Sequence, residues 1–374
     1  MVEIEAAVVR TQGGPFTIEA LSLEDPGPGE VLVRVAGVGL CHTDLVVRDQ
    51  YFPTPLPAVL GHEGAGVVEK VGEGVTKVAP GDHVVLSFAS CGTCANCQNG
   101  LYGYCPDLYG RNFTGARPNG SQPCCDGQGH PVSSYFFAQS SFANLALATE
   151  RNVVKVPKDI PIELMGPLGC GIQTGAGAVI NALKPSAGSS IAVFGAGSVG
   201  LSAVMAARAS GCARIIIVDL NEDRLNFALE LGATDAVNAG TQDPVAAIHA
   251  LTGGEGVQYS LECTGLPKVV RQAVDSLRLT GICGVIGVAP LGTEVALDMN
   301  GILFGRSVRG IIEGDSVPDI FIPQLIELWR QGRFPFDRLV RFYPLAEIEE
   351  AVRASERGEV LKAILLPDPS IRKE

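Results

Sequence analysis

The chain has 374 residues and a formal net charge of −12, with 46% hydrophobic and 18% charged residues. This composition excludes a disordered protein, and the length is enough for two domains. The acidic balance argues against nucleic-acid and membrane partners, because negatively charged phosphates are repelled. The N-terminus lacks the features of a signal peptide and no apolar run is long enough for a bilayer, so we expect a cytoplasmic protein.

Residues 1–90 alternate short apolar runs with glycines and prolines that form turns. The runs that predict strands lie at 6–9, 31–35, 66–69 and 83–86. This pattern favours a mostly antiparallel β domain. The following stretch, 91–141, is rich in Cys, Gly, Asn and Pro, and it predicts a long irregular lobe that is functional or held by a cross-link.

From residue 189 onward, strand-like apolar runs alternate with helix-like segments. The strand-like runs lie at 190–194, 214–218, 258–261 and 282–286. Such alternation predicts an α/β domain with a doubly wound parallel (Rossmann) sheet, covered by helices on both faces. Two amphipathic helices, at 318–330 and 345–357, and a final strand at 361–366 complete the predicted elements.

A glycine motif joins the first predicted strand of this domain to its first helix. Gly195, Gly197 and Gly200 form G-x-G-x-x-G, and Val199 opens the helical segment. Glycine is required at the tight turn, where a pyrophosphate nears the backbone and where helix packs on strand. The helix N-terminus then offers N–H groups to the phosphates. Glycine triplets alone also occur as plain turns, so the motif needs a second signal.

That second signal is an acidic residue at the end of the next strand. Asp219 follows Gly195 at close to the offset of about 20 residues expected for a carboxylate that binds the ribose hydroxyls. A carboxylate there repels a 2′-phosphate, which favours NAD over NADP as the cofactor. Arg224 is either a neighbour of the adenosine ribose or a solvated helix charge, and the sequence leaves both interpretations open.

Eleven cysteines in a chain without a signal peptide indicate metal ligands or buried thiols rather than disulfides. Four of them form two consecutive C-x-x-C steps and one further position: Cys91, Cys94, Cys97 and Cys105. Four soft ligands in one short segment are typical of a closed, tetrahedral structural zinc site. Two disulfides or scattered core cysteines are the alternative interpretation.

Three other candidate ligands lie far apart in the sequence. Cys41, His62 and Cys170 each lie within two residues of a glycine, and each alone is more typical of plain core packing. Together they form a Cys2His set, which leaves the fourth position of a zinc ion open for water or substrate.

These motifs together resemble the zinc-containing medium-chain dehydrogenase/reductase superfamily over essentially the whole chain. The matching pieces are the four-cysteine segment, Cys170, the glycine fingerprint and Gly61-His62-Glu63-x2-Gly66-x5-Gly72-x2-Val75. Within the superfamily, the segments 41–45, 110–113 and 166–175 are most similar to aryl (benzyl) alcohol and related terpenoid alcohol dehydrogenases. The resemblance implies a GroES-like catalytic domain at 1–171 with 315–374, and an NAD-binding Rossmann domain at 172–314.

The resemblance also implies roles for residues around the predicted catalytic zinc. Cys41, His62 and Cys170 would be its ligands, which gives two zinc ions per subunit, one catalytic and one structural. Glu63 would be an occasional ligand during water exchange. Asp44 would be the carboxylate that orients the ring of His62.

Further roles concern the substrate and the cofactor. Thr43 would be the hydroxyl beside the reacting oxygen, and Thr174 would contact the nicotinamide side of NAD. His42 and Lys362 would approach the pyrophosphate. The relay of the departing proton ends in a histidine in better-known relatives, but this chain has Val46 at that position, so His42 or solvent must complete the path.

The expected reaction is hydride transfer between a primary aromatic or allylic alcohol and NAD+, with aldehyde reduction in reverse. Ser87, at a position that lines the pocket in relatives, either leaves room for a bulky ring or is an ordinary polar edge. Alternatives are a general primary-alcohol dehydrogenase, a thiol-adduct formaldehyde dehydrogenase, and a nucleotide-sensing or structural protein that kept the fold. Cys170 argues against polyol oxidation, since those relatives often have glutamate there. We expect a homodimer or homotetramer, with 307–312 as an edge strand.

Overall fold

The computed structural model describes residues 1–371, which fold into two compact units. The first consists of Met1–Cys170, Val317–Gln324 and the segment from Asp337 onward, and the second of Gly171–Ser316 and Leu325–Phe336. The chain therefore leaves the first unit directly after Cys170. In contrast to the ranges expected from the sequence, residues 325–336 belong with the second unit.

The first unit contains two sheets built almost entirely of antiparallel pairs. One has the order β4-β1-β2-β7-β8, and the other has the order β10-β6-β5-β3-β18-β17, with β9 paired to β3. The exception among the paired strands described for this unit is β17 with β18, which run parallel. The strands of this unit are β1 (Val2–Val9), β2 (Phe16–Leu23), β3 (Glu30–Gly39), β4 (Ala58–Val59), β5 (Gly64–Val71), β6 (His83–Leu86), β7 (Cys124–Cys125), β8 (Pro131–Val132), β9 (Leu145–Thr149), β10 (Val153–Val156), β17 (Val340–Pro344) and β18 (Lys362–Leu366).

Strand β3 is central to the core of this unit. Nine of its ten residues are buried, because it is flanked by other strands and carries Val or Leu at half of its positions. Phe136, near the end of the cysteine-rich lobe, and Phe142, just after it, are also fully buried in this core. The loop that contains them is therefore held against the strands that carry His62 and Ser87 at their ends.

The predicted irregular lobe contains only short elements, as its composition suggests. These are α2 (Ala95–Gln98), η1 (Tyr102–Tyr104), α3 (Leu108–Asn112), the two-residue strands β7 and β8, and η2 (Phe136–Ala138). Buried hydrogen bonds order it where hydrophobic periodicity is missing. The side chain of Asn112, for example, bonds both the N–H and the carbonyl of Ala89.

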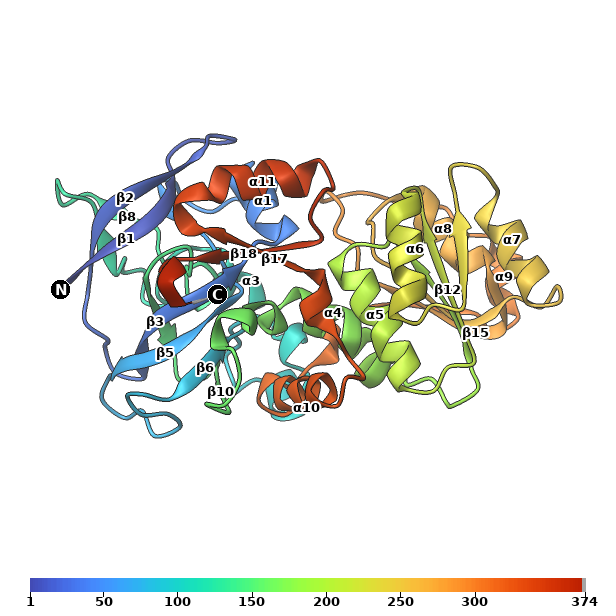
Figure 1. Cartoon of the computed structure of the whole chain (residues 1–374), viewed down its shortest axis with the longest axis horizontal. Helices are drawn as coiled ribbons and strands as arrows, with labels where there is room; N and C mark the ends of the chain where they lie inside the picture. The colour runs from blue at the N-terminus through green and yellow to red at the C-terminus, as the bar shows by residue number, and fades with distance from the viewer. Residues whose placement is uncertain (372–374) are drawn as a thin grey trace. The chain divides into compact units, whose positions relative to one another are not determined.

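The second unit is built on a six-stranded parallel sheet with the order β13-β12-β11-β14-β15-β16. Numbered within the unit this is 3-2-1-4-5-6, the order of dinucleotide-binding folds, with the change of direction between β11 and β14. Helices α5 and α6 cover one face, and α7 and α8 cover the other (Figure 1). The strands are β11 (Ser190–Phe194), β12 (Arg214–Asp219), β13 (Asp235–Asn238), β14 (Val257–Glu262), β15 (Leu277–Val285) and β16 (Ser307–Gly310).

The α/β fold class is thus confirmed, with a mostly β unit and a doubly wound unit. Its α-helices are α1 (His42–Arg48), α4 (Gly171–Gly177), α5 (Ser198–Ala209), α6 (Glu222–Leu231), α7 (Pro244–Leu251), α8 (Pro267–Asp275), α9 (Met299–Leu303), α10 (Pro318–Arg330) and α11 (Ile348–Glu356). Shorter helical turns are η3 (Ile162–Leu164), η4 (Gly166–Gly169), η5 (Ala178–Leu183), η6 (Glu313–Asp315), η7 (Phe336–Leu339), η8 (Leu345–Glu347) and η9 (Pro369–Ile371). Within residues 1–371, no helix has the length and apolar character needed to cross a bilayer.

Candidate active site and structural metal centre

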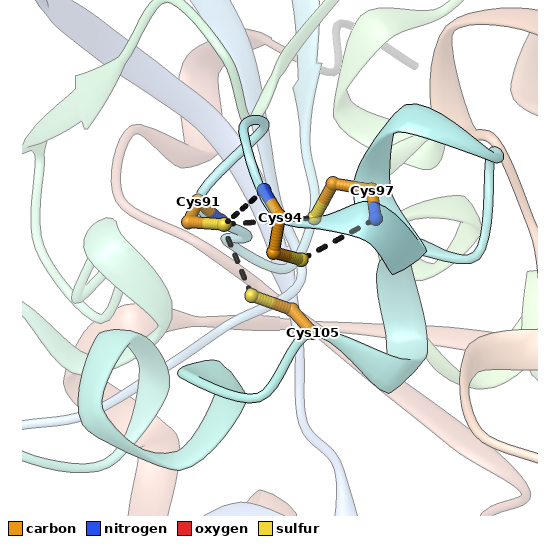
Figure 2. A group of neighbouring side chains, drawn as sticks. All are labelled: Cys91, Cys94, Cys97 and Cys105. Atoms are coloured by element: carbon orange, nitrogen blue, oxygen red, sulfur yellow. Dashed lines mark hydrogen bonds between the residues drawn. The ribbon is translucent and has the colours of Figure 1, made fainter.

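The four cysteines of the lobe converge on one point (Figure 2). Their sulfur atoms all lie within 4.8 Å of one another, and Cys91 Sγ is 3.9 Å from Cys97 Sγ. A disulfide requires a separation of about 2.05 Å, so these are free thiols grouped as metal ligands are grouped. Four sulfurs in this arrangement match the closed site that zinc prefers.

Backbone geometry prepares this cluster for a cation. The N–H groups of Cys94 and Cys97 donate to the sulfurs of Cys91 and Cys94, at 3.3 and 3.4 Å. Backbone donors at Thr93 and Cys94 lower the pKa of Cys91 to about 5, whereas burial raises the pKa of Cys105 to about 11. A thiolate is the form that binds metal, so the N–H groups favour the ligating state of Cys91.

A second cluster unites Cys41, His62, Glu63 and Cys170, whose ligand atoms also lie within 4.8 Å of one another. Cys41 precedes α1, His62 precedes β5, and Cys170 is the last residue before α4. The Nε2 atom of His62 is fully enclosed and has no hydrogen-bond partner among the described residues. Leaving such an atom unpaired is costly, unless a metal ion accepts its lone pair. The donor set therefore fits a zinc ion.

Asp44 connects two of these ligands. Its carboxylate is fully buried and accepts hydrogen bonds from the N–H of Cys41 at 2.9 Å and the N–H of Gly61 at 3.1 Å. The same carboxylate lies 2.8 Å from Nδ1 of His62. A proton on Nδ1 satisfies that contact and leaves Nε2 as the ligating atom.

Charges around the second cluster influence its protonation. A hydrogen bond with Cys170 lowers the pKa of Cys41 well below its ordinary value, and the nearby His62 and Lys362 add to this effect. Burial opposes a charge on His62, but Asp44 and Cys41 raise the pKa of its imidazole overall. The lowered pKa of Cys41 and the raised pKa of His62 have the same cause, because negative and positive groups are packed closely in this cluster.

Glu63 and Lys362 form a buried ion pair beside the same cluster. The Lys362 ammonium lies 2.9 Å from both carboxylate oxygens of Glu63 and also donates to the carbonyl of Leu40 at 3.2 Å. Burial raises the pKa of Glu63, whereas Glu63 raises the pKa of Lys362 despite burial. Lys362 is only 2% exposed. The structure therefore directs Lys362 toward Glu63, and its approach to a pyrophosphate stays a prediction.

The glycine motif has the backbone that its predicted role requires. Gly195 has a φ of +101°, and a Cβ atom on Gly200 would lie 1.8 Å from the carbonyl oxygen of Gly195. Only glycine permits either feature. A Cβ on Gly197 would meet nothing within 4 Å, so the space above this turn is open. Val199 lies in the first turn of α5, and the motif fits a bound pyrophosphate.

Asp219 lies at the carboxyl end of β12, beside that turn. Its carboxylate accepts hydrogen bonds from the N–H of Ala196 at 2.6 Å and from the N–H groups of Leu220 and Asn221. These bonds fix the acid at the carboxyl edge of the sheet, where dinucleotides bind. Arg224 lies in the first turn of α6, and its backbone N–H donates to Asn221.

The other predicted residues occupy different environments. Thr43 lies in the first turn of α1, with its Oγ1 3.8 Å from the sulfur of Cys41. His42, the first residue of α1, is exposed, whereas Val46 is half-buried. Thr174 is 8% exposed, and its hydroxyl donates to Glu313 at 3.4 Å in the second unit.

A group of aromatic rings surrounds His62, a feature that the sequence interpretation missed. The ring of Phe137 lies 4.5 Å from that of His62, and Phe113 packs on Phe137 at 5.3 Å. Further ring contacts extend from Phe113 to Phe52 and Tyr109. Phe137 has a φ of +52°, a strained conformation for a residue with a large side chain. The sequence shows no hydrophobic periodicity that predicts this group, because its members come from three short segments that are separated along the chain.

Comparisons with known proteins agree with both units. Residues 27–158 match the family described as alcohol dehydrogenase GroES-like domain, and residues 198–329 match zinc-binding dehydrogenase. Geraniol dehydrogenase from Castellaniella defragrans is 49% identical over 98% of both chains.

Solved structures extend the comparison to the whole chain. An alcohol dehydrogenase zinc-binding domain protein from Burkholderia ambifaria is 57% identical, with a TM-score of 0.97 over 98% of this chain and 100% of its own. Benzyl alcohol dehydrogenase from Acinetobacter calcoaceticus is 50% identical, with a TM-score of 0.95 over 98% and 99% of the two chains. The chain therefore belongs to the zinc-containing alcohol dehydrogenases of the medium-chain dehydrogenase/reductase superfamily.

Proposed function

We propose that the protein oxidises primary aromatic or allylic alcohols to aldehydes with NAD+. In this reaction the alcohol carbon gives a hydride to C4 of the nicotinamide, and the alcohol oxygen gives a proton to solvent. The observation that carries the proposal is the convergence of Cys41, His62 and Cys170, with Nε2 of His62 lacking a hydrogen-bond partner among the residues that the structure describes. Zinc held by these three residues supplies a Lewis acid for the substrate oxygen.

The residues beside the cluster would handle the proton. Thr43 has its hydroxyl next to Cys41, so it is suited to accept the proton from the alcohol and pass it on. Val46 has no group that exchanges protons. We infer that the path continues either through the exposed imidazole of His42 or directly to water.

The aromatic group near His62 supports the substrate class. Phe52 and Phe113 are half-buried and Tyr109 is 48% exposed, so this group keeps ring surface that is not used up in the core. Aromatic rings favour edge or offset contacts with other π systems. A benzyl ring or an allylic double bond offers such a partner, and similar proteins are named for geraniol and benzyl alcohol.

The preference for NAD rests on Asp219. Its carboxylate is held at the end of β12 by three backbone N–H groups, so it cannot swing away from a ribose bound there. A 2′-phosphate would meet a fixed negative charge at that point. We therefore expect NAD+ to be used in preference to NADP+.

We also propose that the protein forms a homodimer or homotetramer. Strand β16 is an edge strand whose four residues are all exposed. Met299, Leu303 and Phe304 nearby are 84%, 75% and 62% exposed. An exposed strand edge with apolar neighbours favours pairing with a second chain. Location in the cytoplasm stays a prediction.

The test is a set of initial rates, followed as NADH absorbance, for benzyl alcohol, cinnamyl alcohol, geraniol and ethanol. We expect kcat/KM for the first three to exceed that for ethanol, and NAD+ to be preferred over NADP+. Phe113→Ala should lower kcat/KM for benzyl alcohol about 2- to 13-fold, since a ring pair contributes about 0.5–1.5 kcal/mol. Ethanol, which has no ring, is the internal control.

Other outcomes would separate the alternatives. A preference for ethanol would favour a general primary-alcohol dehydrogenase, and activity only with a thiol adduct of formaldehyde would favour that class. Nucleotide binding without turnover of any alcohol would favour a sensing role and would contradict the proposal.

A further inference from the structure

Gln139 is a fully buried amide in the loop that follows the aromatic residues Phe136 and Phe137. Its Nε2 donates to the carbonyl of His62 at 2.9 Å and to the carbonyl of Ser87 at 3.3 Å. Its Oε1 accepts from the N–H of Gly64 at 3.1 Å and the hydroxyl of Ser141 at 3.0 Å. Every hydrogen-bonding site of the amide is used, so the position of Gln139 is fixed.

Ser87, directly after β6, carries this connection to the third ligand. Its hydroxyl donates to the carbonyl of Gly169 at 2.7 Å, and Gly169 precedes Cys170. Its own N–H donates to Asn152, which also donates back to the carbonyl of Ser87. Ser87 has no exposed surface. Ser87 therefore connects two backbone segments by hydrogen bonds in this structure, and it does not form the open edge of a pocket.

Gln139 and Ser87 connect the backbone at His62 to the backbone next to Cys170, whereas Asp44 connects Cys41 to His62. Asp44 joins Cys41 to His62, and its carboxylate contacts Cys41, Gly61 and His62. Cys170 is the last residue of its compact unit, where the chain departs into α4. The hydroxyl of Ser87 bonds the carbonyl of the preceding residue, Gly169, and so anchors the backbone at this junction to the end of β6.

We propose that Gln139 and Ser87 are positioning residues, which set the separation of His62 and Cys170 and so determine how firmly the catalytic zinc is held. Burying an amide and a hydroxyl in a core is costly unless both are fully bonded, and apolar side chains of similar size would fill the space without that cost. Because both groups bond backbone atoms at or next to a metal ligand, their effect is on the placement of those ligands. The inference rests on the proposed zinc site.

The experiment measures zinc release from the purified enzyme to a coloured chelator, for Ser87→Ala, Gln139→Met and the wild type. Loss of a residue that orients a ligand weakens metal binding about 10–100-fold, and these residues act one step further away, so we expect release from the catalytic site to be about tenfold faster. The structural zinc should leave at the wild-type rate. The absorption bands of cobalt placed in the catalytic site should also shift in both variants.

Ser260→Ala is the matched control. Ser260 is fully buried in β14, and its hydroxyl donates to the carbonyl of Ala273 at 2.7 Å, the same bond length as in Ser87. Both variants should lose similar thermal stability, but only Ser87→Ala should change zinc release and the cobalt bands. Ser87→Thr keeps the hydroxyl and should restore both readouts.

The possible results separate the positioning role from the proposed function. If Ser87→Ala retains zinc as firmly as Ser260→Ala, and the cobalt bands are unchanged, the positioning role is wrong. If Gln139→Met does not fold, Ser87→Ala and Ser87→Thr still give the answer. If the wild type binds only the structural zinc, the proposed function fails as well. If the wild type binds two zinc ions and the variants behave like it, only the positioning role fails.

Discussion

The two ligand clusters of this chain are assembled in different ways. Cys91, Cys94, Cys97 and Cys105 come from one short segment, and backbone N–H groups of the same segment bond their sulfurs (Figure 2). Cys41, His62 and Cys170 come from three separate segments, and side chains such as Asp44 connect them. The first cluster therefore holds together the lobe that contains it. The residues of the second cluster are brought together by the packing of the whole β unit.

This difference explains why only the second cluster is suited to chemistry. Four thiols around one ion leave no room for a substrate, while two thiols and one imidazole leave a position open. The second cluster also has a buried ion pair, Glu63 with Lys362, and an aromatic group beside it. The lobe cluster lacks both among the contacts described for it.

The largest effect should come from the second cluster. Cys170→Ser removes one of three ligands, and we expect kcat/KM for benzyl alcohol to fall at least about 10³-fold, because a metal contributes several kcal/mol to the reaction. Thermal stability should change little. Elemental analysis should find one zinc per subunit in place of two, and a variant with full activity would contradict the ligand assignment.

Cys105→Ser tests the first cluster, and here we expect a loss of stability rather than of activity. We expect the Tm to fall by on the order of 10 °C, which corresponds to about 3 kcal/mol in a protein unit of this size, because the lobe has little other structure. Activity measured well below the new Tm should stay within about threefold of the wild type. A variant with unchanged stability but no activity would reverse the roles of the two clusters.

Asp44→Asn should have the smallest effect of the three in free energy, about 1.4–2.7 kcal/mol for a 10–100-fold change. The N–H groups of Cys41 and Gly61 donate to different oxygens of the carboxylate, so the single oxygen of the amide can accept only one of these bonds. The amide also offers no negative charge to His62. A decrease of about 10–100-fold in activity or zinc affinity is expected. Zinc content is measured for both sites. If the structural zinc is unaffected, the two clusters are independent, and equal loss of both ions would show that they are not.

Local motifs allowed much of the site to be predicted. The glycines at Gly195 and Gly200 and the acid at Asp219 carry a spacing that a β–turn–α unit of this kind requires, and in the structure the turn has a positive φ at Gly195 and a hydrogen bond to Asp219. Strand β13 was missed, since its ends are Asp235 and Asn238 and its apolar core is only two residues long. The predicted helix at 345–357 begins as the short turn η8 before α11.

Contacts between distant segments could not be predicted. Nothing in the residues around Gln139 indicates that its amide bonds the carbonyls of His62 and Ser87, and Ser87 was interpreted as a pocket residue. The pairing of Lys362 with Glu63 joins opposite ends of the chain. Such bonds depend on which strands are neighbours, a property that single residues do not encode.

By itself, the sequence determined the groups whose members are close together in the chain: the four-cysteine segment, the nucleotide turn and its acid, and the alternation that gives the parallel sheet. For these, short-range geometry leaves few options. Only the tertiary structure decided how Cys41, His62 and Cys170 meet, and which buried side chains hold them, because bringing distant segments together depends on the packing of the whole β unit. That packing brings an amide, a hydroxyl and a carboxylate to the ligands from loops that the sequence leaves unrelated.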